Sequence, residues 1–237
     1  MSKLITNSQL LHRSKMAAFI LYGSRGSTNT DRIRLTLAEG GFIYYDLVPL
    51  NLQKGEQKSE ENMKRHPWGK VPNITFPGGF ALYESRAICK YLARKYSIPL
   101  LPPDADLEAA ALFDQAESVE MLYFAEPAGR IVYEKFVKKF RGLPPDDAVV
   151  SDALRSVELF FDVAERLLED KDYMAGKNFT LTDIYYIPLI QRLFVCGYGH
   201  FILSRRAVSA WWDRCVNRPA IKEMLAADKE ATAAASK

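Results

Sequence analysis

Hydrophobic and polar positions follow a strand–helix–strand pattern at the start of the chain. The apolar run "AAFILYG" at 17–23 predicts a buried strand, and the helix-like stretch after it ends at Gly40-Gly41, which can supply a left-handed cap. A second strand, "YYDLVPL" at 44–50, comes next. Because two strands joined by a helical crossover lie parallel, this order predicts a βαβ unit.

The following pattern predicts a hairpin and a helix. "NITF" and "FALYE" are short strand candidates separated by the turn sequence "PGG". In the next stretch, 84–96, Ile88, Leu92 and Tyr96 recur at fourfold spacing and form one apolar stripe of a helix. The first domain is therefore an α/β unit of βαβ-ββα order over 17–96.

A proline-rich segment separates this domain from a helical one. "SIPLLPPDAD" interrupts both periods, which predicts a linker at 97–105. Long amphipathic stretches follow it and indicate an all-α domain over 106–226. We expect a flexible tail at 227–237 and a disordered extension at 1–16.

Composition narrows the class of protein. The 237 residues are 48% hydrophobic and 26% charged, and the net charge is only +3, which favours a soluble protein without a nucleic-acid or membrane partner. No apolar run is long enough to span a bilayer. The three cysteines include no CxxC pair, which favours the reducing cytoplasm. Residues 1–16 contain basic residues and no acid, so a mitochondrial targeting segment is the alternative.

Searches for known catalytic motifs leave few candidates. His12, His66 and His200 are scattered, and HExxH, paired CxxC and GxSxG are missing, so we expect no metal and no hydrolase triad. Nucleotide-binding glycine motifs are missing too. What remains is a set of polar groups in the turns of the first domain.

Two of these turns are candidates for binding. Val71 precedes Pro72 just before a strand, so its backbone is extended and can pair with an extended ligand; composition alone favours a trans bond there. Glu84 and Ser85 lie where a strand leads into a helix. They either cap this helix or bind an anion at its N-terminus.

Several segments, in this order and spacing, resemble one known family. "LYGSRGSTNTDRIRL", "DLVPLNLQKGEQK", "HPWGKVPNI" and "LYESRAICKYLARKY" are similar to the glutathione transferases, most closely the phi class, and the likeness continues through "YMAGKNFTLTDIYYIPLIQRL". It covers about residues 18–226. The resemblance implies a thioredoxin-like domain followed by the transferase helical bundle, a homodimer, and glutathione as co-substrate.

The resemblance also implies a set of site residues. The family's serine falls on Ser27, whose hydroxyl would donate a hydrogen bond to the glutathione thiolate. The positions that would bind the tripeptide are Gln57, Lys58 and Lys70 at its glycine end, Val71 and a cis Pro72 at its cysteinyl unit, and Glu84 and Ser85 at its γ-glutamyl end. Thr28 and Asp31 can form a capping box, which would leave the Ser27 hydroxyl free.

The second-substrate pocket is predicted from fewer signals. Arg25 stands where phi members have an apolar or proline-containing stretch, so we expect it at the rim of this pocket, where it would favour acidic acceptors. Tyr123 and Phe124 near Pro127 are further candidates. The expected reaction is conjugation of glutathione to small electrophiles, with hydroperoxide reduction as a second activity. A non-catalytic ligand carrier or interaction protein is the alternative.

Overall fold

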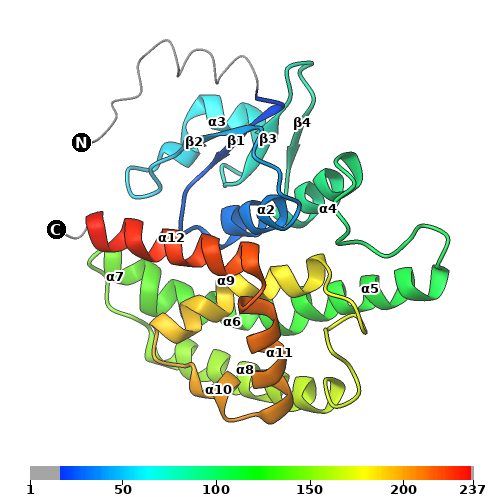
Figure 1. Ribbon diagram of the computed structural model, residues 1–237. Helices are drawn as coiled ribbons and strands as arrows, with labels where there is room; N and C mark the ends of the chain where they lie inside the picture. The colour runs from blue at the N-terminus through cyan, green and yellow to red at the C-terminus, as the bar shows by residue number, and fades with distance from the viewer. Residues whose placement is uncertain (1–16, 236–237) are drawn as a thin grey trace.

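A thioredoxin-like domain stands above a helical domain in the computed structural model, which describes residues 17–235 (Figure 1). The elements of the first domain are, in chain order, β1 (Phe19–Gly23), α2 (Thr28–Glu39), β2 (Tyr45–Pro49), a 3₁₀ turn η1 (Glu56–Lys58), α3 (Glu60–Arg65), β3 (Asn73–Thr75), β4 (Ala81–Tyr83) and α4 (Ser85–Lys95). The predicted βαβ-ββα order is confirmed; η1 and α3 were not predicted.

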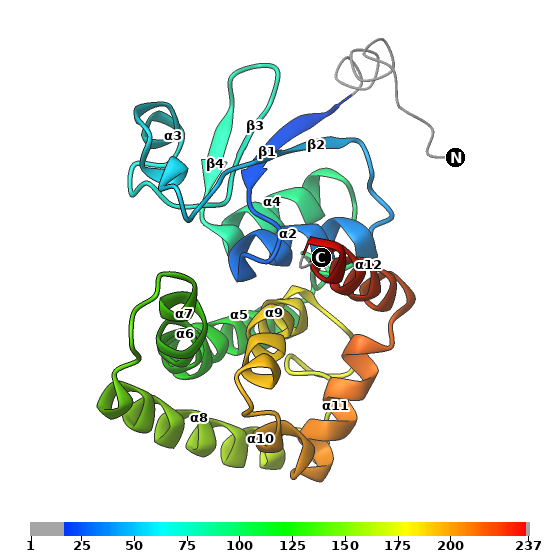
Figure 2. The ribbon, with the colours of Figure 1, turned by 90° about the vertical axis from the view of Figure 1, so that its left-hand side faces the viewer.

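The four strands form one mixed sheet in the order β2-β1-β3-β4. β1 and β2 are parallel, whereas β3 runs antiparallel to both β1 and β4. Helices α2 and α4 cover the face of the sheet that looks toward the helical domain (Figures 1 and 2). Both helices therefore lie between the sheet and the second domain.

The predicted glycine cap at the end of α2 is present. Gly41 has a φ of 62° and donates its N–H to the carbonyl of Ala38 at 3.0 Å, and Phe42 donates to the carbonyl of Leu37 at 2.9 Å. These two bonds are the Schellman pattern, which needs a left-handed residue after the last helical turn. They direct the chain from α2 into β2.

The second domain is built of helices, as predicted. Its elements are α5 (Leu107–Val119), the π-helical segment η2 (Glu120–Ala125), α6 (Glu126–Val132), the π-helical segment η3 (Tyr133–Val137), α7 (Lys138–Phe140), α8 (Asp147–Leu167), α9 (Leu181–Val195), α10 (His200–Leu203), α11 (Arg206–Val216) and α12 (Pro219–Ala235). At the start of α9, Thr180 and Asp183 form a capping box, and the buried Asp183 carboxylate also accepts from Trp211.

The C-terminal segment differs from the sequence expectation. Where the sequence predicts a flexible tail from residue 227, α12 continues as a helix to Ala235 and runs alongside α2 in both views (Figures 1 and 2). The predicted extension at 1–16 lies outside the described residues. Within 17–235, no helix is long and apolar enough to cross a membrane.

Candidate active site

Strand register brings the candidate residues to one end of the sheet. Tyr22, near the end of β1, lies opposite Asn73 at the start of β3, and Asn73 lies opposite Tyr83 at the end of β4. On the other side of β1, Gly23 pairs with Pro49 at the end of β2. The segments that contain Ser27, Val71, Ser85 and η1 all adjoin the sheet at this end.

Ser27 lies at the N-terminus of α2, with its hydroxyl free of capping. It is the N-cap residue (φ −76°, ψ 119°), and its carbonyl accepts from the Asp31 amide at 2.9 Å, but its side chain makes no cap hydrogen bond. The predicted Thr28–Asp31 capping box is wrong, because Thr28 is already helical and the Asp31 carboxylate instead accepts from the Gly26 amide. The Ser27 hydroxyl is nevertheless available at the positive end of the helix.

Val71 and Pro72 are buried and joined by a cis peptide bond, as the family resemblance implies. β3 begins only at Asn73, so the backbone N–H and C=O of Val71 lie outside the strand ladder. An extended ligand can therefore pair with Val71 in the manner of an added strand.

A buried asparagine that the sequence analysis did not identify joins two of the predicted binding segments. Asn62 of α3 donates to the carbonyls of Gln57 at 2.8 Å and Lys70 at 3.1 Å, and accepts from Asn73 at 2.9 Å. The Gln57 side-chain oxygen is buried without a hydrogen-bond partner in the part of the chain that the structure describes. Asn62 thus fixes the position of η1 relative to the segment before the cis bond.

The two predicted cations differ in their contacts. Lys58 donates to the carbonyl of Trp68 at 2.9 Å, whereas the exposed Lys70 contributes its carbonyl to Asn62. The contact of Lys58 with Trp68 holds its ammonium group beside the loop that leads to the cis bond.

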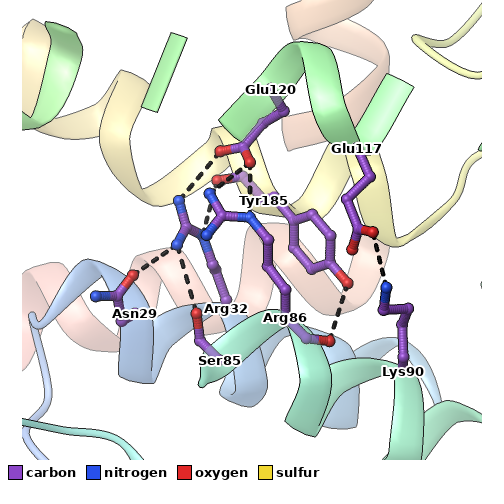
Figure 3. Close-up of polar contacts among 8 residues, drawn as sticks. All are labelled: Asn29, Arg32, Ser85, Arg86, Lys90, Glu117, Glu120 and Tyr185. Atoms are coloured by element: carbon purple, nitrogen blue, oxygen red, sulfur yellow. Dashed lines mark hydrogen bonds and ion pairs between the residues drawn. The ribbon is translucent and has the colours of Figure 1, made fainter. Parts of the chain in front are cut away.

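Glu84 and Ser85 form the start of α4. Glu84 is the exposed N-cap residue, with a φ of 70° and no side-chain cap bond, and Ser85 is buried. Arg32 of α2 donates to the Ser85 hydroxyl at 3.4 Å and to the Asn29 amide oxygen at 2.6 Å (Figure 3). The first turns of α2 and α4 are therefore linked by one guanidinium group.

Arg32 also belongs to a buried ion cluster between the domains, which the sequence analysis missed. The fully buried Glu120 accepts from Arg32 at 3.1 Å and from two nitrogens of Arg86 at 2.8 and 2.5 Å (Figure 3). Arg32 also donates to the carbonyl of Tyr185 at 3.1 Å. Burial lowers the pKa of Arg32, and the charge of Glu120 opposes this change.

Both halves of the chain match one family. Residues 17–94 match the family described as "Glutathione S-transferase, N-terminal domain", and residues 122–219 match "Glutathione S-transferase, C-terminal domain". The chain belongs to the glutathione S-transferase family. Its similarity extends over nearly the full length of known members, so the family assignment covers both domains.

Individual relatives support the likeness to the phi class. "Glutathione S-transferase PM239X14" of Arabidopsis thaliana is 36% identical over 201 residues, which are 83% of this chain and 91% of the relative. "Glutathione S-transferase F6" of the same plant is 33% identical, covering 89% of this chain and all of the relative. The solved structure of glutathione S-transferase I from mais with an atrazine glutathione conjugate has a TM-score of 0.81 at 33% identity, covering 90% of this chain and 99% of that one.

The residues predicted for the second-substrate pocket of this glutathione S-transferase lie in different surroundings. Phe124 does not line an open pocket: it is fully buried in η2, with its ring against those of Phe160 and Tyr186. Tyr123 is 62% exposed. Arg25 lies 3.5 Å from the Asp228 carboxylate on α12, so its charge is directed to this helix.

Within the described residues, no group of three or more His, Cys, Asp or Glu side chains is arranged to hold a metal ion. The side chains at this end of the sheet supply hydroxyl, amide, carboxylate and cationic groups around the N-terminus of α2.

Proposed function

We propose that this chain is a serine-type glutathione transferase, in which the Ser27 hydroxyl donates a hydrogen bond to the thiolate of glutathione. The observation that carries the proposal is the position of Ser27, at the N-terminus of α2 with a hydroxyl that caps nothing. The glutathione conjugates present in related solved structures support glutathione as the ligand of this end of the sheet.

The expected stabilisation is large enough to activate the thiol. A thiol with a pKa of about 8.5 is mostly protonated at neutral pH, and each unit of lowering requires about 1.36 kcal/mol. A hydrogen bond to a charged group contributes roughly 1.5–3 kcal/mol, and a helix N-terminus adds roughly 0.3–1 kcal/mol. Together these contributions lower the thiol pKa by about one to three units.

Glutathione would lie along the end of the sheet. The γ-glutamyl carboxylate would accept from the amide and hydroxyl of Ser85, and the γ-glutamyl ammonium would pair with Glu84. The cysteinyl backbone would pair with Val71. The Gln57 side-chain N–H and the Lys58 ammonium would donate to the glycine carboxylate, with the Lys70 ammonium nearby.

The reaction is a displacement by the thiolate. After the thiol proton has left to solvent, the sulfur attacks an electrophilic carbon of the acceptor. In a chlorinated dinitroarene, a carbon–sulfur bond forms, the carbon–chlorine bond breaks and chloride leaves. Tyr123 remains our candidate for contact with the acceptor.

We extend the proposal to the assembly and location of the protein. The thioredoxin-like domain exposes large apolar side chains, among them Trp68 (65%) and Phe80 (47%), which is consistent with a homodimer. The free cysteines of the described residues are consistent with the cytoplasm. Sedimentation velocity would measure a mass close to twice that of the chain; a concentration-independent monomer would contradict the dimer.

Conjugation of glutathione to a chlorinated dinitroarene by Ser27→Ala tests the proposed chemistry. We expect kcat at neutral pH to fall about 10- to 100-fold, because the lost hydrogen bond is worth roughly 1.5–3 kcal/mol, and the pKa of the bound thiol to rise. Ser24→Ala is the matched control, since Ser24 lies in the same loop and, among the described residues, its hydroxyl contacts only the neighbouring carbonyl of Arg25 at 3.4 Å.

Two outcomes separate the alternatives, and a further assay measures the second activity. Equal activity of Ser27→Ala and Ser24→Ala would refute the serine mechanism. Tight glutathione binding without turnover in the wild type would instead support a ligand carrier. Reduction of an organic hydroperoxide by the same proteins measures the second predicted activity.

A further inference from the structure

The residue before Ser27 is hydrogen-bonded on both sides by charged groups. Gly26 has a φ of 80°, a left-handed conformation that favours glycine. Its amide donates to the Asp31 carboxylate, and its carbonyl accepts from a guanidinium nitrogen of Arg192 at 2.7 Å. The two peptide groups that lead into Ser27 are therefore each fixed by an ionic side chain.

Asp31 is in turn connected to the last helix. Arg34 lies 2.9 Å from Asp31, and its two terminal nitrogens donate to the Asp228 carboxylate at 2.7 and 2.9 Å. Arg25, the neighbour of Gly26, approaches the same carboxylate at 3.5 Å. A chain of charged contacts thus runs from α12 through α2 to the turn that holds Ser27.

Arg192 reaches this turn from the helical domain. It lies in α9, with its guanidinium group 4.3 Å from the centre of the Phe136 ring. Among the side chains described, those of residues 17–229, no carboxylate lies within 4.0 Å of the Arg192 guanidinium group. Its direct polar contact is the carbonyl of Gly26, so the position of α9 determines where this carbonyl lies.

We propose that Arg192 and Asp228 are positioning residues for Ser27. In this scheme α9 and α12, which lie outside the thioredoxin-like domain, hold the turn of Gly26 and Ser27 in place. The inference rests on the proposed role of Ser27 and adds the groups that orient it. Neither residue contacts the thiolate in this scheme. They act by fixing the peptide groups on either side of Gly26, and a small displacement of that turn moves the Ser27 hydroxyl away from the sulfur.

The first test replaces Asp228 by alanine in the full chain. We expect the pKa of the bound glutathione thiol, followed by the ultraviolet absorbance of the thiolate, to rise by up to about one unit, and kcat at neutral pH to fall up to about tenfold. The KM for glutathione should change by less than about twofold, because residues at a distance from Asp228 bind the tripeptide. Asp228→Glu should restore most of both quantities.

Glu223→Ala is the matched control for this variant. Glu223 lies in the same helix and is exposed, and no hydrogen bond or ion pair of its side chain is seen among the described residues. The substitution Glu223→Ala removes one negative charge from α12, as Asp228→Ala does, but leaves the contacts among Asp228, Arg34 and Asp31 in place. Thermal unfolding of both variants shows whether either change acts by loosening the fold.

The second test replaces Arg192 by methionine and by lysine. Arg192→Met removes the donor to Gly26 and should raise the thiol pKa and lower kcat, while Arg192→Lys keeps a donor and should recover part of both. Arg166→Met, at an exposed position of α8, controls for the loss of one positive charge.

The outcomes distinguish this inference from the proposed function. If Ser27→Ala impairs the enzyme while Asp228→Ala and Arg192→Met behave like their controls, the positioning role is wrong and the serine mechanism stands. If Arg192→Met changes only the KM for the acceptor, Arg192 is an acceptor contact and the inference is overturned. If Ser27→Ala has no effect, the proposed function itself fails.

Discussion

Replacing Glu120 by glutamine tests whether the buried ion cluster holds the two domains together. Glu120 is fully buried at the start of η2, and its carboxylate faces Arg32, whose side chain is only 2% exposed, and Arg86, which is 19% exposed. The glutamine is nearly the same size but carries no charge. The glutamine amide has only one oxygen, so its NH₂ group faces at least one of the guanidinium donors, and two donors then oppose each other.

The structure gives the size of the effect. Removing one partner of a buried ion pair leaves an uncompensated charge and costs about 3–5 kcal/mol. Because Arg32 cannot reach solvent, we expect this full range. For a chain of this size, each kcal/mol lowers Tm by roughly 2–4 °C, so the expected decrease is about 6–20 °C.

Thermal and urea unfolding, followed by circular dichroism and tryptophan fluorescence, measure the difference. Glu60→Gln is the control, because Glu60 pairs with Lys64 at the surface, where both side chains are more than two-thirds exposed (87% and 73%). Such a pair contributes about 0.5 kcal/mol or less. A decrease in Tm for Glu120→Gln no larger than that of Glu60→Gln would refute the reasoning.

Two further predictions concern single buried groups. Asp183→Ala should lower the free energy of unfolding by at least about 3 kcal/mol, because the N–H groups of Met174, Thr180 and Trp211 lose their buried acceptor. A change below about 1 kcal/mol in urea unfolding would contradict this. Burial lowers the pKa of His66 below 6.5, although the charge of Glu84 opposes it. The unfolded chain then binds the proton more tightly, so the wild type loses stability as pH falls through 6.5 toward the lower folded value. His66→Asn lacks this loss, so the difference in unfolding free energy between wild type and variant should narrow on acidification. A difference that widens would contradict the lowered pKa of His66.

Local signals in the sequence were enough for most of the fold. The apolar run of the first strand and the glycine cap at Gly41 each involve residues within a few positions of one another. The helix α3 was not predicted, because only one of its six side chains is buried, that of the polar Asn62. An apolar stripe, which predicts a helix, is missing there.

The candidate site was predicted in part, but the residues that hold it in position were not. Family resemblance placed Ser27, Val71 and Ser85, which strand register brings to one end of the sheet. The contacts that hold them join positions far apart in the sequence: Arg32 lies 53 positions from Ser85, and Glu120 lies 88 positions from Arg32. Phe124 was misplaced because the π-helical turn that contains it shifts the helical period, so the sequence did not show which aromatic residue faces the core.

The contact between Arg34 and Asp228 joins positions that are 194 residues apart, which sets an order of events during synthesis. At roughly 5–20 residues per second, α2 leaves the ribosome about 10–40 s before α12. In that interval the sheet and its helices can pack, but the turn before Ser27 lacks its outer contacts. The thioredoxin-like half can therefore form first, and α2 and Arg25 gain their contacts with Asp228 last.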